Sequence, residues 1–193
     1  MMEYVTLDIE TAKLKIEDQA VIDYLISRKF VPSLHPAFSK IIMIGLKEND
    51  GDPFCFFGDD EKEILEDFWS YIYRAKPKRI ITYNGYGFDI PYVNVRSIFN
   101  GIKKHLCYEI NQNKYRMEKS NHYDCMLALS GANNFHYVSL DVSCRLFGIP
   151  ISKDRLLPKE KARHYRDKNW PPIVKYNEED VGLTEKLYQK IKF

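Results

Sequence analysis

The chain has 193 residues, of which 45% are hydrophobic and 29% charged, and its formal net charge is +2. This composition is ordinary for a globular protein, and the net charge is too small to indicate nucleic-acid binding by itself. No apolar run is long enough to span a bilayer, and the N-terminus lacks a signal-peptide pattern. We therefore expect a cytoplasmic protein without a membrane partner, built as a single domain over residues 1–193.

The first half of the chain alternates strand and helix patterns. The predicted elements are strands over 4–9, 40–47 and 53–57 and helices over 17–29 and 60–75. In the first strand, apolar and polar side chains alternate, which puts Asp8 and Glu10 on the same side. The second and third strands are separated by a turn-like Asn-Asp-Gly-Asp sequence, which predicts a hairpin.

The second half continues this alternation. The predicted elements are a strand over 79–83, a helix from about Asp89 to Asn100-Gly101, a short strand ending at Asp124 that caps a helix, and helices over Ser139–Phe147 and 173–191. Residues 30–39 read as a loop, and 103–121 are too polar to assign. Strands alternating with helices predict an α/β domain with a mixed sheet and helices on both faces.

Two basic tracts interrupt an otherwise balanced charge. Residues 153–168 hold seven bases against three acids, and 103–119 hold five against two. Aromatic residues lie among or beside these bases, namely Tyr115, Tyr165 and Trp170, so the tracts could follow a phosphate backbone and stack bases. A solvated surface helix explains either tract equally well.

The four cysteines are widely spread and never form a C-x-x-C pair. We expect reduced thiols instead of a zinc site or a disulfide framework.

Four carboxylates occur in three separate motifs. The motifs are V-T-L-D-I-E-T with Asp8 and Glu10, Y-N-G-Y-G-F-D-I-P-Y with Asp89, and Y-N-E-E-D-V with Tyr176 and Asp180. On a helix, residues four apart share a face, so the last tyrosine and aspartate point the same way. Four acids brought together stay ionised only when divalent cations neutralise them, and two such cations are the usual apparatus for displacement at phosphorus. Each motif taken alone has a structural explanation, but the three in this order predict a metal-dependent enzyme acting on a phosphodiester.

The combination resembles the DEDDy 3′–5′ exonucleases of the ribonuclease H-like superfamily. It is most similar to the proofreading exonuclease domain of family-B DNA polymerases and to its stand-alone prokaryotic relatives. The segments at 36–45 and 139–150 share the resemblance. It implies a ribonuclease H-like, mixed five-stranded sheet flanked by helices, and a hydrolase that releases nucleoside 5′-monophosphates from DNA 3′ ends. A DNA polymerase or repair complex is the candidate partner.

The resemblance also implies roles for the acids around two divalent ions, Mg²⁺ or Mn²⁺. Asp8 would be shared by both ions, and Glu10 and Asp180 would complete the site of the ion that carries the attacking water. Asp89 would hold the second ion, mostly through water. Tyr176 has an ordinary pKa of about 10, so it would orient the nucleophile by a hydrogen bond instead of acting as the base.

Three further residues are expected at the substrate. Thr11 would hold the terminal nucleotide, and Asn84 would contact the backbone or sugar of the substrate. Phe88 would pack against a base, although a core position under the site is the favoured alternative.

Two other functions fit the same residues. One is an exoribonuclease that trims RNA 3′ ends, because the motifs do not distinguish the sugars. The other is a catalytically silent module that binds nucleic acid or assists a polymerase. A phosphatase acting on small phosphate esters is a third possibility.

Overall fold

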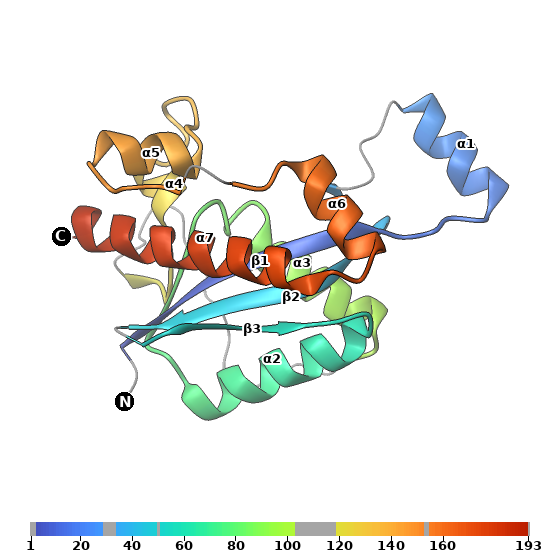
Figure 1. The fold of residues 1–193 in the computed structure, drawn as a ribbon, viewed down its shortest axis with the longest axis horizontal. Helices are drawn as coiled ribbons and strands as arrows, with labels where there is room; N and C mark the ends of the chain where they lie inside the picture. Colours follow the sequence, from blue (N-terminus) through green and yellow to red (C-terminus); the bar gives the residue numbers. More distant parts are fainter. Residues whose placement is uncertain (1–2, 29–33, 50, 103–118, 153–154, 193) are drawn as a thin grey trace.

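The computed structural model describes residues 3–28, 34–49, 51–102, 119–152 and 155–192. Five strands form one sheet in the order β3-β2-β1-β4-β5, so the first strand of the chain lies at its centre (Figure 1). The strands are β1 (Tyr4–Lys13), β2 (Ser39–Glu48), β3 (Pro53–Phe57), β4 (Arg79–Thr82) and β5 (His122–Asp124). Within the described ranges, no helix has the length and apolar character needed to cross a membrane.

The strands β1, β2 and β3 form the antiparallel half of the sheet. The hairpin predicted for the second and third strands is confirmed, since β2 and β3 pair in antiparallel register. On the other side of β2, Asp8 lies opposite Gly45 and Glu10 opposite Met43. The register shifts between Glu10 and Thr11, and β1 continues to pair beyond that shift to Lys13, well past the strand end predicted from alternation.

The strands β4 and β5 form the parallel half. Thr6 pairs with Ile81 in parallel register, and β4 ends one residue later. The loop that follows β4 therefore leaves the sheet beside Asp8, which lies two residues after Thr6 in β1. Parallel neighbours need crossover connections, and helices supply them here.

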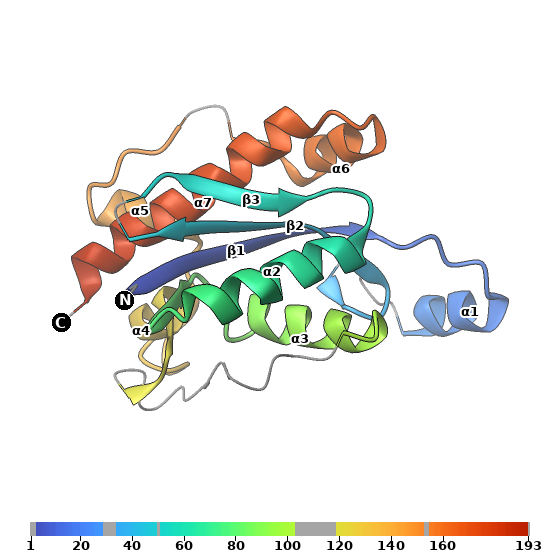
Figure 2. The same cartoon turned by 90° about the horizontal axis from the view of Figure 1, so that it is seen from below.

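The helices α2 (Glu61–Ala75) and α3 (Asp89–Phe99) cover one face of the sheet (Figure 2). Val5, Leu7 and Ile9 of β1 belong to the core cluster on this face, together with apolar residues of both helices. Phe68 is fully buried there, and burial of one such side chain stabilises the fold by roughly 1.5–3 kcal/mol.

The long helix α7 (Trp170–Ile191) lies across the other face, with the short helices α4 (Cys125–Leu129) and α5 (Leu140–Leu146) packed beside it (Figure 1). The core cluster here joins Tyr4 of β1 to Leu183 and Leu187 of α7. Because side chains alternate along β1, Asp8 lies on the same face as Tyr4 and points toward α7. The mixed sheet with helices on both faces is thus confirmed.

One further helix confirms a prediction, and another is not predicted from the sequence. The helix α1 (Gln19–Ser27) is near its predicted position but buries no residue, and it projects past the end of the sheet (Figure 1). The helix α6 (Pro158–Arg166) forms within the basic tract 153–168, and it packs against α7. The second basic tract, with Tyr115, lies almost wholly outside the described residues. Among the cysteines that the structure describes, Cys55, Cys125 and Cys144 are free thiols.

Candidate metal centre and active site

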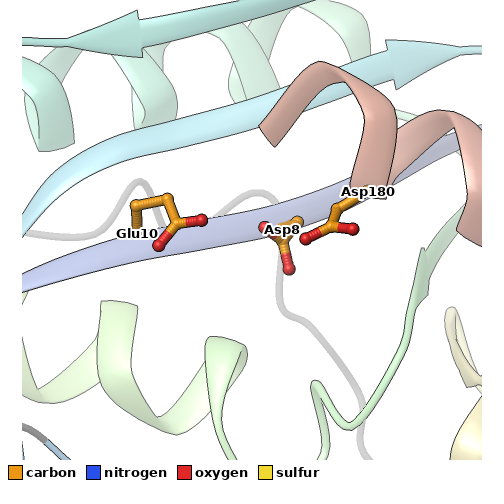
Figure 3. A group of neighbouring side chains, drawn as sticks. All are labelled: Asp8, Glu10 and Asp180. Atoms are coloured by element: carbon orange, nitrogen blue, oxygen red, sulfur yellow. The ribbon is translucent and has the colours of Figure 1, made fainter. Parts of the chain in front are cut away.

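Three carboxylates converge on the face of the sheet covered by α7. Oxygen atoms of Asp8, Glu10 and Asp180 lie within 4.8 Å of one another, and Figure 3 shows the three side chains together over β1. Asp8 and Glu10 are two residues apart on one strand, so alternation gives them the same side. Asp180 comes from the middle of α7, which packs against β1 and β2. The convergence of the first and third motifs, expected from the sequence, is present in the structure.

The three carboxylates repel one another in a poorly solvated place. Burial raises the pKa of Asp8 well above its usual value, and neighbouring carboxylates, first among them Asp89, raise this pKa further. Burial is also the main cause that raises the pKa of Glu10 and the pKa of Asp180. A group of acids with raised pKa values binds protons or cations readily.

Two basic side chains partly offset this negative charge. The Lys161 ammonium contacts both carboxylate oxygens of Glu10, at 3.0 and 2.9 Å. The Arg155 guanidinium pairs with Asp180 and also donates to the Tyr176 hydroxyl at 3.1 Å. Sequence reasoning gave neither base a role at the site, although both lie in the basic tract 153–168. The composition of the tract indicates positive charge, but it does not show which carboxylates the basic side chains contact in the folded protein.

Asp89 lies beside the three-acid group without being part of it. It is the first residue of α3 and is 3% exposed. Its carboxylate accepts a hydrogen bond from the Ile9 backbone N–H at 3.0 Å, which fixes it next to the strand that carries Asp8 and Glu10. Burial raises the pKa of Asp89 to about 7, although backbone hydrogen bonds act in the opposite direction.

Tyr176 lies one turn before Asp180 on α7, as expected from the spacing of the third motif. Burial and the charge of Asp180 raise the pKa of the Tyr176 hydroxyl well above its usual value. The Lys161 ammonium lies 4.2 Å from the centre of the tyrosine ring and the Arg155 guanidinium 4.8 Å from it. Because its pKa is raised, the hydroxyl stays protonated at neutral pH and is available as a hydrogen-bond donor.

The loop between β4 and α3 carries Asn84, and a second buried aspartate shapes it. Asn84 has a left-handed backbone with φ of 68°, and its N–H donates to Asp124 at 3.0 Å. The same Asp124 carboxylate accepts from the N–H groups of Tyr86, Met126 and Leu127, at 2.8, 3.0 and 3.2 Å. The capping role predicted for Asp124 is thus confirmed, and the residue also holds the loop of the second motif.

A cleft of about 690 Å³ adjoins the carboxylates. Thr11 and Phe88 line it, together with Tyr165 and Lys159 from α6, whereas Asn84 is not among its lining residues. Phe88 also packs against Tyr92, with ring centroids 5.0 Å apart, at the edge of the core on the α3 side. Phe88 therefore borders the core, which is the position favoured from the sequence, and it also forms part of the wall of the cleft.

The donor set fits a hard divalent cation. All the ligand atoms offered by Asp8, Glu10 and Asp180 are carboxylate oxygens, the ligand type that Mg²⁺ and Mn²⁺ prefer. Burial raises the pKa of all three carboxyl groups although Lys161 and Arg155 act in the opposite direction, and for Asp8 the neighbouring carboxylates raise the pKa further. The site could therefore bind a divalent cation and hold it at the mouth of the cleft.

Comparison with known proteins gives a consistent result. Residues 35–193 match a family described as a predicted 3′–5′ exonuclease related to the exonuclease domain of PolB. The DNA polymerase epsilon catalytic chain of Emericella nidulans is 29% identical over 144 residues, which cover 72% of this chain and 6% of that protein. A DNA polymerase from Pyrococcus glycovorans is 27% identical over 168 residues, which cover 76% of this chain and 21% of that protein.

A solved structure supports the same fold. The family B DNA polymerase from the hyperthermophilic archaeon Pyrobaculum calidifontis aligns with a TM-score of 0.72 at 20% identity, over 99% of this chain and 24% of that one. The family match begins after β1, so Asp8 and Glu10 lie outside it, whereas the structural alignment spans nearly the whole chain. This chain corresponds to only a small part of each polymerase that it resembles.

Proposed function

The chain belongs to the family described as a predicted 3′–5′ exonuclease related to the exonuclease domain of PolB, and we propose that it is an active, metal-dependent exonuclease on single-stranded DNA 3′ ends. The observation that carries the proposal is the group of three carboxylates within 4.8 Å. The similar polymerases named above are DNA polymerases, which supports DNA as the substrate and a polymerase or repair complex as the partner.

The acids of the site would hold two divalent cations, Mg²⁺ or Mn²⁺. Asp8, Glu10 and Asp180 would hold one of them, and Asp89 together with Asp8 would hold the other. Such ions, when bound, supply a hydroxide near neutral pH and offset the negative charge at a phosphodiester. The buried position of Asp89 beside Ile9 N–H keeps its carboxylate in place for this role.

Tyr176 would orient the attacking water. Its hydroxyl stays protonated because burial and Asp180 raise its pKa, so it cannot accept a proton from the water at neutral pH. A protonated hydroxyl can instead donate a hydrogen bond to the oxygen of the nucleophile and fix its direction of approach. This is the role that the family resemblance implies for Tyr176.

The cleft would receive the terminal nucleotide. Thr11 supplies a hydroxyl at its wall and Phe88 an aromatic surface, and bases stack favourably on such surfaces. Lys159 and Lys161 bring positive charge to the same cleft, where phosphates would lie. Asn84, which does not line the cleft, would contact the backbone or sugar of the next nucleotide. A single strand or a frayed end suits this arrangement, because the terminus must enter the cleft.

An end-labelled oligonucleotide assay tests the proposal. A 5′-labelled single strand incubated with Mg²⁺ or Mn²⁺ should shorten stepwise from its 3′ end and release nucleoside 5′-monophosphates, and chelator should stop the reaction. Asp180→Asn serves as the matched control for contaminating nucleases. Matched RNA run in parallel tests the sugar: degradation of RNA alone would assign an exoribonuclease. Binding of the strand without degradation of either substrate would indicate a silent module.

A further inference from the structure

Asn177 is a fully buried amide on α7, directly after Tyr176 in the chain. Its Nδ2 donates a hydrogen bond to Asp8 Oδ2 at 2.8 Å and lies 3.5 Å from the Asp8 carbonyl oxygen. Its Oδ1 is buried and has no hydrogen-bond partner among the residues that the structure describes. The amide thus makes its hydrogen bonds with one residue of β1 and leaves its acceptor unused.

This arrangement costs stability. A buried carbonyl oxygen without a partner has lost the hydrogen bonds that it makes with water in the unfolded chain. Several buried positions of α7 are apolar, such as Ile173, Val181 and Leu187, and the buried acids Asp180 and Glu185 of the same helix have basic partners. An apolar side chain at position 177 would avoid the cost. A buried polar atom left without a partner in this way is expected where function requires it.

Gly45 provides the space that Asn177 occupies. It lies in β2 directly opposite Asp8, and a Cβ at this position would fall 1.7 Å from Asn177 Oδ1. Its neighbours in the strand, Ile44 and Leu46, are fully buried apolar residues. A glycine inside a strand weakens it and marks a close approach by another group. Here that group is the Asn177 amide.

The hydrogen bond from Asn177 to Asp8 matters because the two other acids of the group have basic partners of their own. Glu10 has Lys161 and Asp180 has Arg155 as a basic partner. The Asp8 carboxylate instead accepts a hydrogen bond from the neutral Asn177 amide. Without that donor, repulsion from the other carboxylates would favour rotation of the Asp8 side chain away from the group.

We propose that Asn177, seated on Gly45, is a positioning residue that fixes the Asp8 carboxylate in the orientation needed to bind a divalent cation. This inference rests on the proposed metal-dependent function. One oxygen of Asp8 is directed at the amide, and the carboxylate is thereby held on the side of Glu10 and Asp180. The buried amide lowers the stability of the fold, but it holds the Asp8 carboxylate in its cation-binding orientation before a cation binds.

Asn177→Ala and Asn177→Leu test this directly. We expect the thermal midpoint in chelator to stay the same or rise. We expect the Mn²⁺ affinity measured by calorimetry to fall about 10-fold or more, since outer partners of metal ligands typically contribute this much. On a single-stranded oligonucleotide, kcat should fall while KM changes little. A purely structural role predicts the opposite pattern, in which stability falls and Mn²⁺ affinity at low temperature is kept.

Gly45→Ala provides an independent approach from another strand. It should displace the Asn177 amide, lowering both stability and Mn²⁺ affinity. Combined with Asn177→Ala it should recover stability, because the clash is removed, but it should not recover the affinity. Thr184→Val, which removes a buried hydroxyl seven residues further along α7, should bind Mn²⁺ as the parent does.

The outcomes separate the two proposals. If the parent protein binds Mn²⁺ and the Asn177 variants bind it equally well, the positioning role is wrong and the proposed function stands. If the parent protein itself fails to bind Mn²⁺ or Mg²⁺, the proposed function is wrong, and the inference drawn from it is overturned as well.

Discussion

Two clusters of buried charge in this molecule differ in how they are balanced. One lies between α2 and α3, where the 6% exposed Glu61 accepts hydrogen bonds from Arg96 at 2.8 and 2.5 Å. The same carboxylate accepts from Ile41 N–H at 2.6 Å and from Asn100 at 2.9 Å. One acid meets one base, and backbone and amide donors satisfy what remains.

The other cluster lies between β1 and α7 and holds a surplus of acids. Three carboxylates lie within 4.8 Å with Asp89 close by, and Lys161 and Arg155 are their basic partners. Burial raises the pKa of Asp8 and that of Asp180, and the neighbouring carboxylates raise the pKa of Asp8 further. In this molecule, the buried charge that serves the fold is matched by partners within the protein, whereas the group with surplus acids marks a place for a ligand.

The largest effect is expected from Asp8→Asn. Oligonucleotide degradation should fall by about 10³-fold or more, because one of the cation ligands is lost. The thermal midpoint in chelator should stay the same or rise, because repulsion among the acids decreases. Nuclease rates with both proteins purified identically, combined with thermal unfolding, measure the two quantities. A strong loss of stability would assign the acid cluster to the fold instead.

Arg96→Met should produce the opposite result in the balanced cluster. Removing one partner leaves Glu61 buried without its base, and this typically costs about 3–5 kcal/mol. Chemical denaturation would measure the free energy of unfolding. Activity per folded molecule, assayed well below the new midpoint, should remain close to that of the parent protein. If the variant were as stable as the parent protein, the Glu61–Arg96 cluster would not be the one that serves the fold.

The pH dependence of stability should come from the acid cluster in the absence of cations. A carboxyl whose pKa is raised on folding binds more protons in the folded state, so stability falls as pH rises from the ordinary pKa of 3.8 to the folded value. For Asp89 the folded pKa is about 7, and a tenfold difference in proton affinity between the two states corresponds to about 1.4 kcal/mol. Unfolding in chelator across pH 4 to 8 should show this decline. Asp89→Asn should reduce the decline by the share of this one carboxyl, because the other acids of the cluster also have raised pKa values, and saturating Mn²⁺ should reverse it at pH 8.

The smallest effect is expected from Lys161→Met. The Lys161 ammonium occupies both oxygens of Glu10, so it competes with a divalent cation for that carboxylate. Partly exposed ion pairs contribute up to about 1 kcal/mol, which corresponds to about a fivefold increase in Mn²⁺ affinity when the competitor is removed. Calorimetry at constant ionic strength measures the change. Weaker binding would mean that the lysine supports the cation site instead of competing for it.

The sequence predicted the elements of this fold well because most of them carry local signals. Alternation defined β1, the Asn-Asp-Gly-Asp turn defined the hairpin, and Asp124 was recognised as a helix cap. The start of α7 was placed too late because it begins at Trp170, ahead of two prolines, and the first turn of a helix tolerates proline. The alternation of strands and helices along the chain correctly predicted that helices cover both faces of the sheet.

The candidate site was only partly predictable. The acids could be found because they fall in motifs with fixed spacing. The partners of those acids could not, since Lys161 meets Glu10 across 151 residues and no local pattern records such a pairing. The same is true of Asn177 and Gly45, whose relation depends on how closely α7 approaches β2. These contacts are properties of tertiary packing, which periodicity does not describe.

The hydrogen bonds to the Asp124 carboxylate have a consequence for local unfolding at the edge of the sheet. It accepts hydrogen bonds from the backbone N–H groups of Asn84, Tyr86, Met126 and Leu127, and β5, which ends at Asp124, is three residues long at the border of the sheet. Because one side chain protects all four amides, detachment of this short strand would release them together. Their protons should then exchange with solvent at a common rate, faster than those of the sheet centre. The turn that carries Asn84 would thus lose its shape in the same local unfolding event.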